Sequence, residues 1–310
     1  MITDIKGLHH VTSLASSAQV NNDFFTGTLG LRRVKKTVNF DAPEVYHLYY
    51  GDGAGTPGTV MTYFPFPHAK RGTGGTGEVR TTAFAVPGGA LPYWQDRLAG
   101  AGVDGLSRDT RFGNARLLFR GPDGDGFALV ESDADRRSPW TGNGVPEEVA
   151  IRGFHSTDLA LRDPAATAEL LRFMGYEEDD RVDDVSRWRL PEGNGANVID
   201  LSRIDAPAAT QGAGSVHHVA FEVADRETQL SARAALTDTG YDVTPPIDRD
   251  YFWAIYFRTP GGVLFEIATK EPGFDRDEAP EALGQALKLP SQHEHLRPVL
   301  EERYLQPIRD

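Results

Sequence analysis

The chain carries two pairs of adjacent histidines in apolar strings, His9-His10 in Leu-His-His-Val and His217-His218 in Val-His-His-Val. One carboxylate, Glu266, stands between a phenylalanine and an isoleucine in an equally apolar run. A carboxylate in such a setting is costly to bury unless a cation accompanies it. Imidazole and carboxylate groups are ligands of divalent metal ions. We therefore predict that His10, His218 and Glu266 bind one metal ion.

The type of metal follows from the ligand set. Two neutral imidazoles and one carboxylate suit Fe(II) and leave open coordination positions, Mn(II) would also fit, and zinc fits less specifically. The chain contains no cysteine, so a thiolate metal site or an iron–sulfur cluster is excluded.

These residues belong to a fourfold repeated pattern of a short apolar strand, a helix and several alternating strands. Each expected helix ends at a glycine followed by an apolar residue, at Gly30, Gly102, Gly175 and Gly240. The pattern predicts an α+β protein of four β-α-β-β-β units. We expect an N-terminal two-unit domain over residues 1–132, a polar linker over 133–148, a C-terminal two-unit domain over 149–270 and a tail over 271–310. Residues 279–287 and 296–304 of the tail are expected to form short helices.

Comparing the units shows that the metal-ligand pattern occurs once. The counterparts of His10, His218 and Glu266 in the other units are Ser156, Thr81 and Ala128. If the units pair into two cups, units one and four supply the ligands, and units two and three form a cup without metal-binding groups at these positions.

The composition argues against two classes of partner and bears on the location of the protein. The net charge is −13 and the pI about 5.2, which argues against nucleic acid or an anionic membrane surface as a partner. The absence of cysteine favours a cytoplasmic protein, and there is no run of about 18 apolar residues that could span a bilayer.

The Gly-Leu-His-His-Val-Thr opening, the Val-His-His-Val-Ala string and the Pro-Gly-Gly-Val-Leu-Phe-Glu run resemble the vicinal-oxygen-chelate superfamily, which includes glyoxalases, bleomycin-resistance proteins and extradiol dioxygenases. More narrowly, they resemble its hydroquinone-type ring-cleaving dioxygenases. The resemblance implies two vicinal-oxygen-chelate domains, the same three metal ligands, and further site residues that fall on His9, Thr12, His217, Arg249 and Tyr256.

For two of these residues, strand geometry gives a different expectation. Alternation along a strand would turn His9 and His217 away from the face that carries His10 and His218, unless a bulge redirects them. We interpret four further histidines as structural: His47, His155, His293 and His295.

The function that the resemblance implies is Fe(II)-dependent ring cleavage, with a small aromatic substrate, a hydroquinone or a catechol, and dioxygen. Folds of this kind often assemble, so a homo-oligomer is compatible with the sequence. Two alternatives stay open. One is a glyoxalase-like lyase or isomerase with Zn or Ni, and the other is a non-catalytic protein that sequesters an aromatic compound.

Overall fold

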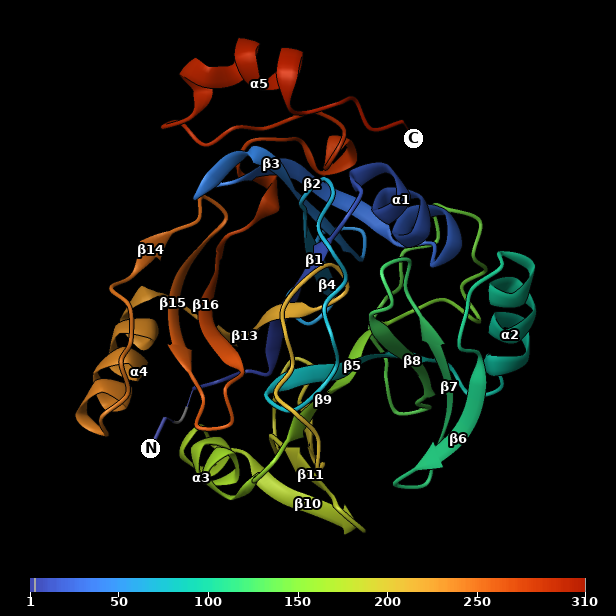
Figure 1. The fold of residues 1–310 in the computed structure, drawn as a ribbon, viewed down its shortest axis with the longest axis vertical. Coiled ribbons are helices and arrows are strands. Elements are labelled where there is room, and N and C mark those ends of the chain that lie inside the picture. Colours follow the sequence, from blue (N-terminus) through green and yellow to red (C-terminus); the bar gives the residue numbers. More distant parts are fainter. Residues whose placement is uncertain (3, 310) are drawn as a thin grey trace.

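The computed structural model describes residues 1–2 and 4–309, and these form two curved eight-stranded sheets with few helices (Figure 1). The first sheet has the order β14-β15-β16-β13-β1-β4-β3-β2. Its strands are β1 (Leu8–Ala15), β2 (Arg32–Asn39), β3 (Ala42–Gly51), β4 (Val60–Pro65), β13 (Val216–Val223), β14 (Ile247–Asp248), β15 (Phe252–Arg258) and β16 (Leu264–Pro272).

The second sheet has the order β10-β11-β12-β9-β5-β8-β7-β6. Its strands are β5 (Glu78–Val86), β6 (Ser107–Arg111), β7 (Asn114–Arg120), β8 (Gly126–Glu131), β9 (Gly153–Leu161), β10 (Glu177–Val182), β11 (Val185–Arg189) and β12 (Val198–Arg203). The helices are α1 (Ala18–Asn22), which continues into a π-helical turn (Asp23–Thr28), α2 (Leu91–Gly100), α3 (Ala165–Phe173), α4 (Arg226–Asp238) and α5 (Arg297–Arg303).

The predicted α+β fold of four repeated units is confirmed, and so is the way the units pair. Units one and four form the first sheet, and units two and three form the second. Each unit's main helix is followed by a glycine with positive φ, such as Gly102 at 70° and Gly240 at 93°. This is the left-handed position that ends a helix and that glycine adopts without steric cost.

The segment 133–148 contains no helix or strand and links the two sheets through Arg137. The Arg137 guanidinium donates to the carbonyl oxygen of Gly58 at 3.1 Å and to that of Phe154 at 2.7 Å, and so ties the loop before β4 to β9. One hydrophobic core includes buried residues of both sheets, such as Val11 and Phe154. The division into domains at residues 132 and 149 stays a prediction.

The tail lies across the edge formed by β2 and β3, as the top of Figure 1 shows. Helix α5 agrees with the helix expected over 296–304. The expectation over 279–287 was wrong, because this stretch contains only a 3-10 turn (Pro280–Ala282). Here the backbone runs alongside β2 instead. Lys36 forms a β-bridge with Leu287, and the carbonyl oxygen of Lys36 accepts from the backbone N–H of Lys288.

Two bulges interrupt the pairing of β1 with β13. The register passes from Leu8 opposite Phe221 directly to His10 opposite Ala220, so His9 is an extra residue on β1. It also passes from His218 directly to Val216, so His217 is an extra residue on β13. A bulge turns the side chains beside it out of strict alternation. No helix among the described residues is long and apolar enough to cross a membrane.

Candidate metal centre

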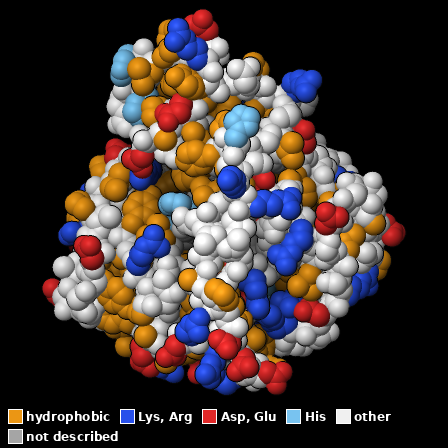
Figure 2. Space-filling model, viewed as in Figure 1, with side chains coloured by type: hydrophobic (Ala, Val, Ile, Leu, Met, Phe, Trp, Pro, Cys, Tyr) orange, Lys and Arg blue, Asp and Glu red, His pale blue; other side chains and the backbone are white. Residues whose placement is uncertain are grey.

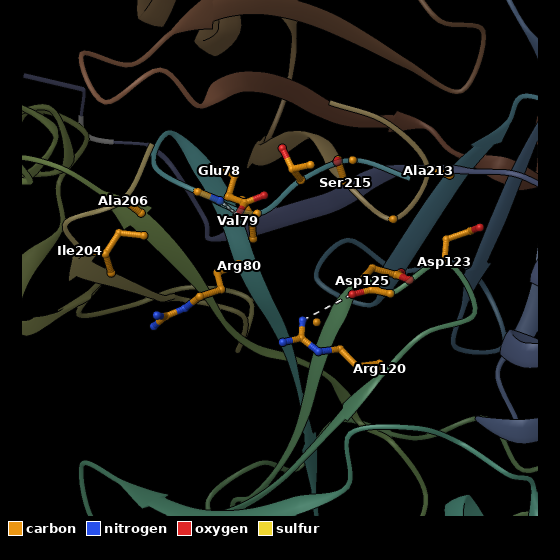
Figure 3. A pocket seen from close by; sticks show the side chains of 17 residues that line it. Glu78, Val79, Arg80, Arg120, Asp123, Asp125, Ile204, Ala206, Ala213 and Ser215 are labelled. Atoms are coloured by element: carbon orange, nitrogen blue, oxygen red, sulfur yellow. Dashed lines mark hydrogen bonds between the residues drawn. The ribbon is translucent and has the colours of Figure 1, made fainter. Parts of the chain in front are cut away.

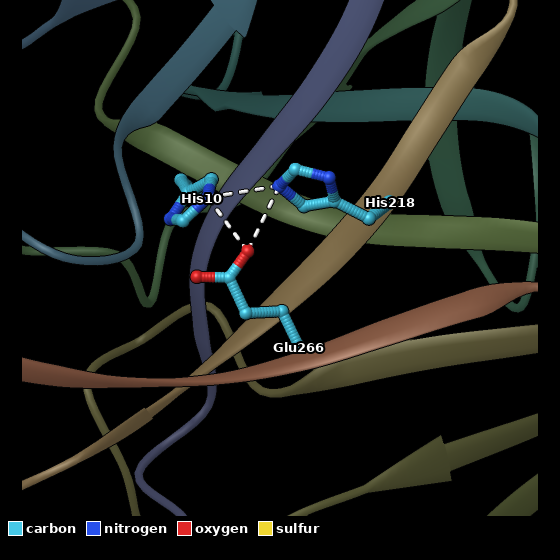
Figure 4. Close-up of side chains that lie close together, drawn as sticks. All are labelled: His10, His218 and Glu266. Atoms are coloured by element: carbon cyan, nitrogen blue, oxygen red, sulfur yellow. Dashed lines mark hydrogen bonds and ion pairs between the residues drawn. The ribbon is translucent and has the colours of Figure 1, made fainter. Parts of the chain in front are cut away.

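His10, His218 and Glu266 converge from three neighbouring strands of the first sheet (Figure 4). One ligand atom from each lies within 4.8 Å of the other two, and all three residues are buried. The Nε2 atoms of His10 and His218 are 3.2 Å apart. An oxygen of Glu266 lies 2.9 Å from Nε2 of His218 and 3.5 Å from Nε2 of His10. The strand register produces this meeting, because Ala220, which is opposite His10, also pairs with Glu266.

The histidine that precedes each ligand holds its ring in place. Nδ1 of His9 lies 2.9 Å from Nδ1 of His10, and Nδ1 of His217 lies 2.8 Å from Nδ1 of His218. When the ligand histidine is the donor in each pair, the lone pair of its Nε2 faces the centre of the triad. Hydrogen bonds to the second ring nitrogen commonly fix the orientation of metal-binding histidines.

The donor set fits a divalent cation. The carboxylate of Glu266 is fully buried, and neither of its oxygens accepts a well-oriented hydrogen bond within the described chain. A buried acceptor left in this way is destabilising unless another group satisfies it. Two imidazole nitrogens and one carboxylate around one point form a facial set of metal ligands.

The protonation states agree with this fit. Burial lowers the pKa of His218 in spite of the neighbouring carboxylate, which favours the neutral, metal-binding imidazole. Burial alone would raise the pKa of Glu266, but the positive charge that His10 and His218 carry when protonated outweighs burial and holds that pKa well below its usual value. A bound cation would supply this positive charge when both rings are neutral. The carboxylate is therefore ionised at neutral pH.

A cavity of about 330 Å³ opens beside the triad. Figure 2 shows it as a hollow with hydrophobic side chains on its walls and a histidine visible inside. The aromatic and aliphatic lining is Leu14, Phe40, Tyr49, Phe64, Phe66, Phe252, Tyr256 and Leu264. A cavity of this size and lining suits a small, largely apolar ligand held by a few polar groups.

Three of the predicted non-ligand residues, His217, Arg249 and Tyr256, line this cavity. Nε of Arg249 donates to the hydroxyl oxygen of Tyr256 at 3.3 Å, and Tyr256 lies opposite Glu266 on the neighbouring strand. Burial, followed by the charge of Glu266, raises the pKa of Tyr256, so the phenol is protonated at neutral pH. The hydroxyl accepts from the guanidinium and keeps its own proton to donate.

The other two, His9 and Thr12, do not line the cavity. His9 lies behind His10, with its ring centroid 5.2 Å from that of Phe252, and burial lowers its pKa to about 3. The hydroxyl of Thr12 bonds that of Thr62 at 2.8 Å. His9 supports the ligand ring of His10 through the contact between their Nδ1 atoms, whereas Thr12 lies two residues beyond His10 on the same strand.

We expected His47 to have only a structural role, but the structure places it in the wall of the cavity. Nε2 of His47 lies 2.8 Å from the Thr62 hydroxyl, and its Nδ1 lies 2.8 Å from the Tyr49 hydroxyl. Because Thr62 also bonds Thr12, a continuous chain of polar groups leads from Tyr49 in the cavity wall to the strand that carries His10. The alternation of Val45, His47 and Tyr49 along one face was the available signal.

The second sheet reproduces the same register without the metal ligands. Ala83 lies opposite Ser156 and pairs with Ala128, as Ala220 does with His10 and Glu266. The sequence alignment of the units is therefore confirmed at these positions. His155, the extra residue of a bulge on β9, corresponds to His9.

The partly buried His155 should make the protein sensitive to acid. Burial first, and then the charges of Arg187 and other arginines, lower its pKa from 6.5 to about 3. Below pH 6.5 the unfolded chain takes up a proton that the folded protein does not, so stability falls as the pH decreases from 6.5 toward 3, by about 1.4 kcal/mol for each pH unit. Urea unfolding of His155→Gln at pH 4 to 6.5 should show a slope lower by nearly this amount. The exposed His295→Gln is the control, and equal slopes in all three proteins would contradict the assignment.

The chain belongs to the Glyoxalase/Bleomycin resistance protein/Dioxygenase superfamily, whose family model matches residues 7–267. The resemblance in the sequence is thereby confirmed. The chain is 39% identical over 313 residues to a chlorohydroquinone/hydroquinone 1,2-dioxygenase of Sphingobium indicum, with 98% of this chain and 97% of that protein covered. It is 43% identical over 300 residues to MhqO of Bacillus subtilis, provisionally named a ring-cleaving dioxygenase, with 96% of each chain covered.

One solved structure is similar to this chain in both sequence and fold, and another is similar in fold alone. A crystal structure of a Bacillus subtilis protein, provisionally titled a dioxygenase, superposes with a TM-score of 0.95 at 42% identity over 99% of this chain and 98% of that one. Glyoxalase I of Zea mays superposes with a TM-score of 0.64 at 14% identity over 86% of this chain and 93% of that chain, and this likeness shows the fold alone.

Proposed function

We propose that this protein is a metal-dependent dioxygenase that opens the ring of a hydroquinone-type aromatic compound. The observation that carries the proposal is the position of the His10, His218 and Glu266 triad beside a cavity lined by aromatic side chains. Near-full-length similarity to a protein named for chlorohydroquinone and hydroquinone supports the substrate class. Catechols are the second substrate class to test.

The metal we propose is Fe(II), with Mn(II) as the substitute that the ligand set also accommodates. His10, His218 and Glu266 would hold it and leave up to three positions of an octahedron open. When bound, such a metal favours the phenolate form of a phenol and makes dioxygen reactive toward it. We place the enzyme among the mononuclear extradiol-type ring-cleaving dioxygenases and expect it in the cytoplasm.

Arg249 and Tyr256 would orient the substrate and stabilise its developing negative charge. The guanidinium is fixed by the Tyr256 hydroxyl at 3.3 Å and by Asp41 at 3.2 Å, and it lies on the cavity wall. The Tyr256 hydroxyl keeps one proton to donate to a phenolate oxygen. Donors that are held in place before the reaction stabilise charge without reorganising.

His217 is the residue we propose for moving the substrate's proton. Its bulge places it in the cavity wall, and burial, followed by the neighbouring His218, lowers its pKa to about 4. The ring is therefore neutral at neutral pH. Because its Nδ1 accepts from Nδ1 of His218, the ring proton is on Nε2, from which it can be donated to an oxygen of the substrate and regained. His9 is buried behind His10 and would act on substrate only through that ring, so we assign it a positioning role, together with Thr12.

The walls of the cavity would hold one aromatic ring and limit access of water. Phe64, Phe252 and Leu264 supply apolar surface on different strands of the sheet. Excluding water strengthens the interaction of Arg249 and Tyr256 with a phenolate, because the local dielectric constant is lower than that of water.

Removing the Tyr256 hydroxyl should slow the reaction without loss of metal. In Tyr256→Phe we expect kcat/KM to fall about a hundredfold, the cost typical of losing one donor to a developing negative charge. Steady-state kinetics with metal analysis of the same samples checks this. The matched control is Tyr93→Phe, which loses an arginine-to-tyrosine bond of 3.2 Å from Arg97 outside the cavity. Equal kinetics in the two variants would remove Tyr256 from the mechanism.

A substrate panel tests the proposed function. Anaerobically Fe(II)-loaded protein is mixed with oxygenated buffer and hydroquinone, chlorinated or methylated hydroquinones, or catechols, and ring-opened product is measured by absorbance and mass. Product with at least one hydroquinone, and none with His218→Ala, is the expected result. Iron-loaded protein that gives no product with any compound would reject ring cleavage, and lyase or isomerase activity with other metals would be tested next.

A further inference from the structure

The second sheet forms a cup that repeats the bulges of the first. Its register passes from Val79 opposite Leu159 to Thr81 opposite Asp158, so Arg80 is the extra residue on β5. Arg80 therefore corresponds to His217, the bulge residue that lines the cavity of the first cup. Both cups thus use a bulge to place a polar side chain beside the position of the second metal ligand.

A cavity of about 320 Å³ lies at this bulge in the second cup. Thr81, which corresponds to His218, and Leu118, which corresponds to Tyr256, are in its wall. Its charged lining residues are Arg80, Arg111, Arg116, Arg120 and Asp109. Although the chain has a net charge of −13, Lys and Arg side chains gather on the part of the surface that covers the second sheet (Figure 2).

The carboxylates nearby do not neutralise these arginines. The Asp109 carboxylate accepts two hydrogen bonds from the Arg116 guanidinium, at 2.8 and 2.5 Å. Asp158 accepts one bond from Arg80 at 2.7 Å and one from Arg111 at 2.9 Å. A third carboxylate, Asp200, lies 3.6 Å from Arg111 and is bound by Arg187 at 2.8 and 2.9 Å. With Arg120 and Arg187 included, five guanidinium groups face three carboxylates, which leaves two positive charges in excess.

The arginines of this cavity also have N–H donors that no described residue engages. Among the described residues, hydrogen bonds engage only Nη2 of Arg80 and only Nη1 of Arg111. Arg120 makes one long bond, from Nη1 to the carbonyl oxygen of Gly124 at 3.4 Å. A guanidinium carries five N–H donors, so each of these side chains retains several for a ligand.

An adjoining cavity of about 420 Å³ differs in its charges. Figure 3 shows Arg80 and Arg120 at this cavity together with three acidic side chains, Glu78, Asp123 and Asp125. Acids outnumber arginines there, so an anion is favoured in the cavity of the second cup and not in this adjoining one.

We propose that the second cup is a binding site for a small oxyanion with two negative charges, such as a dicarboxylate or a phosphate. Planar guanidinium groups bind carboxylate and phosphate oxygens through paired hydrogen bonds, which suits a ligand of this class. The site is separate from the metal centre, and it stands independently of the reaction proposed for that centre.

Isothermal titration calorimetry on the full-length, metal-free protein tests the site. Inorganic phosphate and succinate are titrated separately, with the ionic strength held constant by sodium chloride. We expect saturable binding of one ion per chain by at least one of them, and which of them binds identifies the type of oxyanion. Arg111→Gln and Arg120→Gln should each weaken it about tenfold or more, the loss expected when a charge-assisted hydrogen bond is removed.

Two controls locate the ion. Arg162→Gln removes an arginine whose side chain is 62% exposed, pairs with the exposed Asp205 and donates to the carbonyl oxygen of Ala206, and it should leave the affinity unchanged. Glu266→Ala should also bind normally, because it alters only the first cup. Arg120 is itself exposed, so its variant decides the question if Arg111→Gln fails to fold. Absence of saturable binding, or binding that neither arginine variant weakens, would overturn the proposal.

Discussion

Glu266→Ala should yield a folded protein that retains almost no metal and forms no ring-opened product. The carboxylate is the only charged member of the triad, and one of its oxygens, Oε2, lies 2.9 and 3.5 Å from the two imidazole nitrogens that would share the ion. Outer-shell partners of metal ligands already cost about 10- to 100-fold in affinity when removed, so loss of a ligand should cost more. Elemental analysis after Fe(II) loading, with circular dichroism to verify folding, measures this effect.

Glu222→Ala is the matched control for this variant. Glu222 is also a strand carboxylate with little exposure, but it bonds Asn194 and does not line the cavity. This control should keep its iron and its activity. If Glu266→Ala held iron and turned over substrate as well as Glu222→Ala does, the assignment of the metal centre would be wrong.

Lys35→Met should destabilise the protein by about 3 to 5 kcal/mol, the usual cost of removing one partner of a buried ion pair. The Lys35 side chain is fully buried, and its ammonium lies 2.6 Å from Asp277 and 2.5 Å from Glu278. The substitution keeps the apolar stem but leaves the Glu278 carboxylate, 3% exposed, without its cation. These contacts fasten the tail to β2, so the tail should also become more sensitive to proteolysis.

Urea unfolding monitored by fluorescence measures the change in stability. Lys270→Met alters an exposed lysine and should change the free energy of unfolding by less than about 0.5 kcal/mol. A Lys35→Met protein as stable as this control, with an equally resistant tail, would show that the ion pair does not hold the tail in place.

The sequence was most informative where polar residues interrupt apolar strands. His10, His218 and Glu266 were predicted as one site because each is metal-competent and lies in a run that must be buried. The structure brings them within 4.8 Å, and the pairing of unit one with unit four explains how. The fold class and the superfamily are likewise confirmed, whereas the identity of the metal stays a proposal.

The features that sequence reasoning missed depend on contacts between distant strands. Strict alternation would turn His9 and His217 away from the site unless a bulge redirects them, and the bulges that the structure contains have no marker in the residues themselves. His47 looked like an isolated strand histidine until its bonds to Thr62 and Tyr49 placed it in the cavity wall.

The charged network of the second cup illustrates the same limit. Arg80 and Asp158 are 78 residues apart in sequence, and only the pairing of β5 with β9 makes them neighbours. From the sequence, this cup could be described only by the ligands that it lacks.

The most direct test of ring cleavage by dioxygen is isotopic. Fe(II)-loaded protein is given a hydroquinone that it consumes under ¹⁸O₂. The reaction is quenched at once, and the mass of the ring-opened product is measured by mass spectrometry. A dioxygenase places both atoms of one O₂ molecule in each product, so the mass should rise by two ¹⁸O substitutions, with one O₂ consumed per ring. Oxygen consumption that yields only quinone or hydrogen peroxide, with no ¹⁸O in a ring-opened product, would contradict the proposed function.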